Sequence, residues 1–131
     1  MIEITNEYIT NNQLNKAALT LLGADIVEFK GDKIIFKKAI MFYTSALTSL
    51  DKVIFNSKVE FFYCTSLNSL DGATFNNRVV FRECYNLTSV AGASFNGKVV
   101  FSWCRSLASV FGATFNQGFK AIGCPKLKQK E

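Results

Sequence analysis

Hydrophobic and polar residues recur along the chain with a period of twenty. The stretch VVFRECYNLTSV at 79–90 is followed twenty residues later by VVFSWCRSLASV, with Val-Val-Phe, Cys and Leu at identical offsets. A fixed period in this range is typical of repeat architectures, in which each residue lies above its equivalent in the next repeat. The sequence therefore predicts a solenoid.

Within each unit the apolar positions alternate with others, which indicates short strands, and no apolar run is long enough for a helix. Complete units start at Ser49, Ser69, Ser89 and Ser109, and a weaker unit starts near Phe29, with Thr44 in place of a cysteine. Columns that stay apolar in every complete unit predict the core, among them Leu50, Leu70, Val90 and Val110; Phe55, Phe75, Phe95 and Phe115; Val59, Val79, Val99 and Phe119; and Leu67, Leu87, Leu107 and Leu127.

Two further columns have the residue types that tight corners need. Glycine, which adopts positive φ without strain, stands at 72, 92 and 112, and asparagine stands at 56, 76, 96 and 116, where stacked amides can form a hydrogen-bonded ladder. We predict a mainly all-β protein, a β-solenoid of about five 20-residue coils over residues 29–128 with strands ~4.8 Å apart.

Residues 1–28 are predicted to be an N-terminal cap made of a strand and an amphipathic helix. Thr10 and Gln13 have capping-box spacing, and Gly23 marks the stop. The apolar stripe between them consists of Leu14, Ala17, Ala18, Leu21 and Leu22. Covering the first coil is the favoured use of this stripe, and binding a partner is the alternative. Residues 129–131 are a charged tail, and the whole chain is one structural domain.

Composition narrows the function classes. The 131 residues have a net charge of +5, which favours acidic partners, and contain no histidine, which removes Ser-His-Asp and Cys-His catalysis and most zinc ligand sets. The N-terminus lacks the order of a secretion signal and no segment has the ~20 apolar residues that span a bilayer, so we expect a cytoplasmic location, in a bacterium or a host cell, and no membrane association.

The four cysteines, Cys64, Cys84, Cys104 and Cys124, stand twenty residues apart. Equivalent atoms one coil apart are ~4.8 Å from each other, which does not allow zinc to gather four thiolates at ~2.3 Å. The Cα–Cα distance between neighbouring cysteines would allow a disulfide, but the torsion of ~90° about the S–S bond is difficult to reach between parallel, in-register side chains. We therefore predict a stack of buried reduced thiols, with no metal and no cofactor.

A basic column precedes the second strand of each unit, at Lys38, Lys58, Arg78 and Lys98, with Lys37 beside it. Like charges facing each other across a ladder are destabilising. One interpretation is that these side chains spread into water and discourage edge association. The other is a basic ridge that binds an acidic protein surface or nucleic-acid phosphates.

The same strand has aromatic, arginine and apolar residues at outward or rim positions. The candidates for partner contact are Tyr63, Arg82, Trp103, Val80 and Val100, and Ile40 is also expected to face outward. Strict alternation would point Phe62 and Arg82 away from Tyr63 and Trp103. Such residues are typical anchors of protein interfaces. The alternative is that the N-terminal segment or a second copy of the chain covers this strand.

The segments CTSLNSL at 64–70 and CRSLASV at 104–110 follow the pattern Cys-x-x-Leu-x-Ser-Val/Leu, which resembles the BspA-like class of bacterial leucine-rich repeats. The Gly-Ala-Thr/Ser-Phe-Asn segments at 72–76, 92–96 and 112–116 are similar to short repeats of phage and bacterial proteins of that kind. Because Gly92 and Gly112 stand where the pattern has a third apolar residue, we expect a compact all-strand coil rather than a horseshoe with one helix per repeat. The resemblance implies protein binding and brings no catalytic residue.

These observations lead us to expect a non-enzymatic protein-binding module whose partner has an acidic surface. Because small free-standing repeat proteins of this kind occur among phages, one specific version is a phage inhibitor of a host defence complex, similar to an anti-CRISPR protein. The alternatives are nucleic-acid binding through the basic column and a structural or self-assembling solenoid, as a monomer or a homodimer. An enzyme is not expected, because the paired Asp51 and Asp71 stand at a solvated corner without a cleft.

Overall fold

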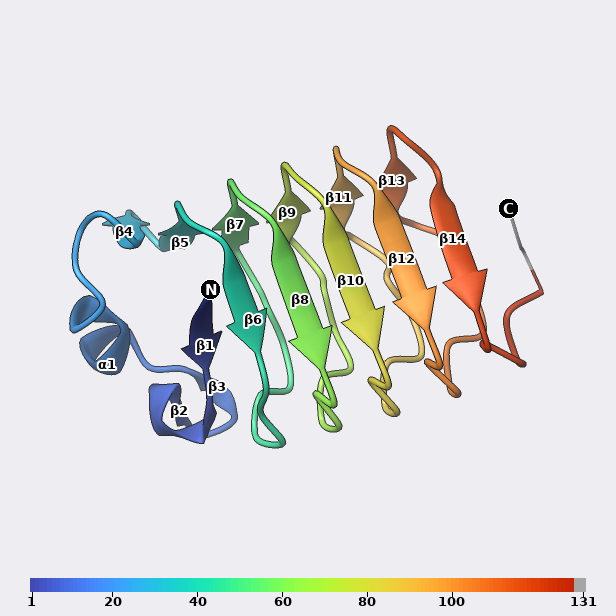
Figure 1. Cartoon of the computed structure of the whole chain (residues 1–131), viewed down its shortest axis with the longest axis horizontal. Helices are drawn as coiled ribbons and strands as arrows, with labels where there is room; N and C mark the ends of the chain where they lie inside the picture. The colour runs from blue at the N-terminus through green and yellow to red at the C-terminus, as the bar shows by residue number, and fades with distance from the viewer. Residues whose placement is uncertain (129–131) are drawn as a thin grey trace.

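The computed structural model describes residues 1–128. Two six-stranded sheets extend along the stack of repeats, with the core between them. The first sheet has the order β1-β6-β8-β10-β12-β14 and the second the order β13-β11-β9-β7-β5-β4, so each repeat contributes one strand to each sheet. Figure 1 shows the repeats side by side from the N-terminal cap to the last coil. The predicted β-solenoid is confirmed, with about four turns where about five coils were predicted.

The strands of the solenoid are short and pair in parallel within each sheet, as stacked coils require. Their bounds are β5 Lys33–Phe36, β6 Ile40–Phe42, β7 Val53–Phe55, β8 Val59–Phe62, β9 Thr74–Phe75, β10 Val79–Arg82, β11 Ser94–Phe95, β12 Val99–Ser102, β13 Thr114–Phe115 and β14 Phe119–Ile122. The remainder of each coil, from the cysteine to the next strand, is irregular and contributes buried apolar side chains, such as Leu87, Val90 and Ala93, to the core.

Two ladders of phenylalanine rings fill the interior between the sheets. Phe75 and Phe95 stack at a centroid distance of 4.9 Å along one sheet, and Phe75 meets Phe81 of the other sheet edge to face at 5.9 Å. Both geometries are favourable for aromatic pairs, and each such pair contributes about 0.5–1.5 kcal/mol beyond its area burial. The coil therefore has a dry aromatic core, which holds the outer side chains at regular positions.

The predicted corner chemistry is confirmed. Gly72, Gly92 and Gly112 have φ of +78°, +82° and +84°, a region in which an L side chain is strained. The amide Nδ2 of Asn116 donates to Oδ1 of Asn96 at 2.6 Å, and the ladder continues to Asn76 at 2.7 Å and to Asn56 at 2.9 Å. One amide in each coil is thus bonded to its equivalent in the next.

The first coil is one residue out of step with the expected period. Ile40 pairs with Val59 and Phe42 with Phe61, an offset of nineteen, whereas Ser49 bridges to Ser69 at an offset of twenty. The chain therefore has one residue fewer between Phe42 and Ser49 than in the equivalent part of the second coil. Two predictions are wrong as a result. Lys38 lies opposite Ser57 rather than Lys58, and Ile40 faces the core, where it is fully buried.

The N-terminal segment covers the first coil, as expected, but with different elements from those predicted. It comprises β1 Ile2–Ile4, the 3-10 helix η1 Asn6–Tyr8, β2 Ile9–Thr10, β3 Gln13–Leu14, α1 Lys16–Thr20 and β4 Val27–Lys30. Strand β1 extends the first sheet beside β6, and β4 forms a hairpin with β5 at the edge of the second. In Figure 1 this whole segment lies at the β6 end of the stack.

The predicted helix is wrong in its start and in its buried face. Thr10 and Gln13 pair across the β2–β3 hairpin, and the helix begins after Asn15, whose side chain accepts a hydrogen bond from the Ala18 amide at 3.0 Å. Its fully buried residue is Leu19, which was not in the predicted stripe, while Leu21 is 87% exposed. Leu14 and Leu22 of the predicted stripe do pack against the core, partly buried. The stop at Gly23 is confirmed by its φ of +93°. The predicted charged tail, residues 129–131, lies outside the described residues.

Candidate functional site

The basic column, defined here as Lys58, Arg78 and Lys98, lies at the start of β8, β10 and β12. The Val59 amide donates to the Arg78 carbonyl at 3.1 Å and the Val79 amide to the Lys98 carbonyl at 2.9 Å, so the three residues stand one above another. All three side chains are exposed. Within residues 1–128 the ion pairs are Lys37–Glu28 and Lys52–Asp32, and neither involves the column. The column is therefore a row of like charges ~4.8 Å apart with no carboxylate paired to it.

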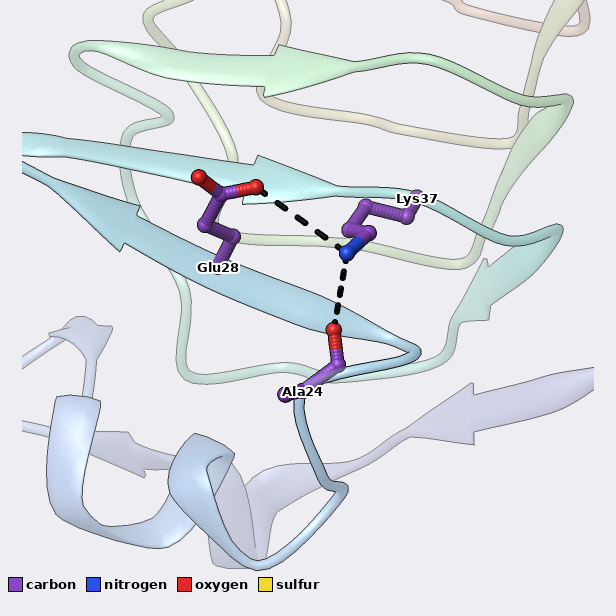
Figure 2. Close-up of polar contacts among 3 residues, drawn as sticks. All are labelled: Ala24, Glu28 and Lys37. Carbon is purple, nitrogen blue, oxygen red and sulfur yellow. Dashed lines mark hydrogen bonds and ion pairs between the residues drawn. The ribbon is translucent and has the colours of Figure 1, made fainter.

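Lys38 and Lys37 do not extend this column. Lys38 is exposed but displaced from it by the shorter first coil. Lys37 is attached to the cap, because its Nζ donates to the Ala24 carbonyl at 3.0 Å and lies 4.0 Å from Glu28 Oε1. Figure 2 shows this ammonium group between the two acceptors, beside the β4–β5 hairpin. Lys37 thus fastens the cap to the first coil and belongs to the fold rather than to the candidate site.

The aromatic edge, defined here as Tyr43, Tyr63 and Trp103, lies at the opposite edge of the same sheet, where these residues follow β6, β8 and β12. All three rings are exposed, and those of Tyr43 and Tyr63 lie 6.1 Å apart. Tyr63 and Trp103 have φ of +52° and +56°, and Glu83 between them has +54°. Strand alternation therefore ends at residues 62, 82 and 102, where a left-handed corner residue follows β8, β10 and β12. The expectation that Tyr63 and Trp103 point away from Phe62 and Arg82 rested on strict alternation, which does not extend to these corner residues.

Glu83 is the centre of a polar cluster within the aromatic edge. The Tyr85 hydroxyl donates to Glu83 Oε1 at 2.8 Å. Hydrogen bonds from Tyr63 and Tyr85 hold the pKa of the Glu83 carboxyl below its usual value, and the charges of Arg105 and Arg82 act in the same direction. The same contact raises the pKa of the Tyr63 hydroxyl, because its proton is bonded to a carboxylate. The cluster fixes the polar ends of two tyrosines while their rings stay accessible.

Two cation–π pairs connect neighbouring coils on this side. The Arg105 guanidinium carbon lies 4.2 Å from the ring centre of Tyr85, and that of Arg82 lies 5.2 Å from the ring centre of Phe62. Sequence reasoning missed Tyr85 and Arg105. The signal that could have revealed them is an aromatic residue and an arginine exactly one repeat apart in the column after the cysteine. Arginines stacked in this way are preorganised, which lowers the entropy they lose on contact with a partner.

Between the two edges the outer face of the sheet is apolar at Val80 and Val100 and charged at Glu60 and Lys120. Val80 stands in register between Glu60 and Val100, and these neighbours leave it only 6% exposed. Val100 is half-buried. The N-terminal segment, which sequence reasoning considered as a cover for this strand, lies at the β6 end instead (Figure 1). Val100 therefore offers more contact area than Val80, whose neighbours on the chain itself already shield it.

The cysteines form the predicted stack of free, buried thiols. Each thiol donates to a backbone carbonyl of the preceding coil, as Cys84 does to Phe61 at 3.6 Å and Cys104 to Phe81 at 3.5 Å. Hydrogen bonds with the thiols of Cys104 and Cys64, together with burial, raise the pKa of Cys84, and burial raises that of Cys124. Among residues 1–128, no three His, Cys, Asp or Glu side chains come together as a group that could hold a metal ion. The thiols therefore act in packing.

Comparison with known proteins gives no relative from which a function could be transferred. No family model, no curated protein and no solved structure matches the chain. None of the helices that the structure describes is long and apolar enough to cross a membrane.

Proposed function

We propose that the chain is a non-enzymatic protein-binding module, and that its contact surface is the outer face of β8, β10 and β12 with the basic column at one edge and the aromatic edge at the other. The observation that carries this proposal is the basic column itself. Three exposed cations are stacked one coil apart without a paired carboxylate, although unlike charges in neighbouring coils would be more stable. A partner with an acidic surface would supply the missing charges.

The rest of the face supports a protein partner. Five residue steps separate Lys58 from Tyr63, so the two edges are roughly 16 Å apart. Exposed Tyr and Trp rings with stacked arginines are the residue types that dominate binding energy at protein interfaces. The charged edge would steer the encounter, and Trp103 and Tyr63 would supply the apolar anchors.

The resemblance of the CRSLASV and CTSLNSL segments to BspA-like leucine-rich repeats also supports protein binding as the activity. A more specific version of the proposal is a phage protein that acts in the bacterial cytoplasm and inhibits a host defence complex such as a CRISPR effector. An acidic patch on the surface of such a complex would be complemented by the basic column.

Nucleic-acid binding is the second candidate, favoured by the same column and by aromatic rings that could stack with bases. Glu60 and Glu83 on the same face oppose it, because they repel phosphates. Counterion release separates the two candidates. If the column neutralised three phosphates of duplex DNA, the logarithm of the binding constant would fall with the logarithm of salt concentration with a slope of about −2.7.

The test of the proposal is affinity capture from the host bacterium with the unmodified chain and with a variant carrying Lys58→Glu, Arg78→Glu and Lys98→Glu. We expect a protein that the unmodified chain retains and the variant loses, in nuclease-treated extract. Sedimentation of the free chain would show whether the capturing species is a monomer or a homodimer. Capture that is equal for both chains would contradict the proposal.

A further inference from the structure

The basic column is interrupted in the last coil, where a glycine takes the place of the next cation. Val99 pairs with Phe119, so Gly118 stands in register with Lys98. Gly118 has a φ of +70° and no side chain to occupy the space beside Lys98. A hollow of about 320 Å³ lies there on the outer face. Its volume is at the lower end of the range of small-molecule and side-chain pockets.

Cations surround this hollow and apolar groups line part of its wall. Arg78, Lys98 and Lys120 all contribute to its lining, together with Val100 and Phe119, both of which are half-buried. A second hollow of about 350 Å³ at the adjoining corner also includes Arg78 and Lys98, so these two side chains face open space on both sides. The site thus combines three positive charges with an apolar surface.

No carboxylate of the neighbouring coils competes for these charges. From Cys84 to Lys128 the sequence has five cations and no Asp or Glu. The acidic residues nearest along the chain are Glu83, Asp71 and Glu60. Tyr63 and Tyr85 engage Glu83, Asp71 stands at the corner beside Gly92, and Glu60 lies two strands away from β12. No carboxylate within residues 1–128 therefore neutralises the positive potential of the hollow. An external anion would be attracted by this potential, reduced only by salt screening.

From this arrangement we propose that the hollow beside Gly118 binds a carboxylate that is attached next to an apolar or aromatic group, such as a Glu or Asp flanked by a Phe or Leu on a partner protein. Arg78 can hold a carboxylate through two parallel hydrogen bonds, and Lys98 and Lys120 add point charges. Val100 would contact the apolar group, while Phe119, which also lines the hollow, packs its ring against Phe101 and Phe115 of the core. This inference rests on the proposed function and identifies the anchoring point of the acidic partner.

A nuclear magnetic resonance titration of the free chain with three small anions tests the site without a partner. We expect phenylacetate to shift the backbone amides of Gly118, Lys98 and Val100, with acetate binding more weakly because it lacks the ring. Inorganic phosphate should bind no better than acetate. Phosphate that shifts the same amides at lower concentration than phenylacetate would overturn the inference and favour a phosphate site for nucleic acid. No localised shift with phenylacetate would overturn it as well.

Matched substitutions within one column make the test specific. Lys98→Gln and Arg78→Gln should each weaken phenylacetate binding roughly three- to tenfold, as expected for the loss of one partly screened charge contact. Lys58→Gln is the control, since it removes an equivalent charge from the same column three coils away from Gly118. Equal losses in all three variants would show a diffuse field rather than a site, and would contradict the inference. That outcome would not contradict the proposed function. The proposed function is tested separately by partner capture, in which Lys58 is expected to take part.

Discussion

The indole ring of Trp103 lies directly over Gly123 of the next coil, so that a Cβ atom placed on Gly123 would be 2.5 Å from Cδ2 of Trp103. Gly123 ends the column in which Tyr63, Glu83 and Trp103 also adopt positive φ. The absence of a side chain at Gly123 is what allows the ring of Trp103 to rest against the backbone at the aromatic edge.

We therefore predict that Gly123→Ala displaces the indole and destabilises the chain by about 1–2 kcal/mol, the cost of a side chain at positive φ together with the clash. Trp103 is the only tryptophan, so its fluorescence reports the displacement directly. Adding Trp103→Ala to Gly123→Ala should relieve the clash. The loss of stability measured by urea denaturation should then reflect only the cost of a side chain at positive φ. Unchanged emission together with unchanged stability in Gly123→Ala would show that the ring does not rest there.

The asparagine ladder predicts an effect that depends on position along the stack. Asn96 takes part in two ladder hydrogen bonds and Asn116 in one. Since a hydrogen bond of this kind contributes about 0.5–1.5 kcal/mol, and less at an exposed corner, Asn96→Ala should lower the free energy of unfolding roughly twice as much as Asn116→Ala. Urea denaturation of both variants measures this. Equal effects would mean that the ladder adds nothing beyond each residue's own corner conformation.

The thiol stack predicts that the cysteines are inert in the native state. Cys64, Cys84 and Cys104 have no exposed surface, so a reagent cannot reach them in the folded chain. Hydrogen bonds between the thiols raise the pKa of Cys84 and lower those of Cys64 and Cys104, so burial is what protects all three. A reagent must reach a thiolate to react, so a disulfide reagent at pH 8 should label none of the four at an appreciable rate, and all four in urea. Rapid labelling of Cys84 under native conditions would contradict the packing role assigned to it. Cys124 lies at the end of the stack, so its labelling rate can be compared with those of the three other cysteines.

Glu83 predicts a specific pH dependence. Its pKa is lowered in the folded chain, so its contribution to stability is complete above the pKa of the unfolded chain and is lost as pH falls through the folded value. The stability difference between the unmodified chain and Glu83→Gln should be constant above about pH 5 and shrink below about pH 4. The same variant should bring the pKa of Tyr63 down towards its ordinary value, which nuclear magnetic resonance can follow at alkaline pH. A Tyr63 titration that does not move would show that Glu83 is not its partner.

Much of the fold could be predicted from the sequence because stacked coils repeat their chemistry. The phenylalanine and leucine columns, the corner glycines such as Gly92 and the buried thiols each recur at one offset, and every copy supports the same interpretation. The register of the first coil was not predicted correctly, because a one-residue shortening between Phe42 and Ser49 is visible only in the strand pairing. That shortening removed Lys38 from the basic column and turned Ile40 inward.

The candidate site was predicted less completely, for reasons that are local. Tyr63, Glu83 and Trp103 are residue types that rarely adopt positive φ, so nothing in their identity indicated that the strand ends before them. Gly123 in the same column was the available signal. The cap helix was misplaced because Thr10 and Gln13 match a capping pattern, while the hairpin that pairs them brings Asn15 to the helix start instead.

The most direct test of the central claim is the dissociation constant of the captured partner for two variants of equal net charge. One carries Lys58→Glu, Arg78→Glu and Lys98→Glu, and the other carries Lys16→Glu, Lys30→Glu and Lys126→Glu, which reverse three exposed charges outside the outer face. We predict that the first weakens binding at least about a hundredfold, as expected when like charges are brought together at an interface, while its thermal unfolding stays close to that of the second. The second should bind within about threefold of the unmodified chain, because charges remote from an interface act only through the screened field. Equal affinities of the two variants would contradict the assignment of this face as the binding surface.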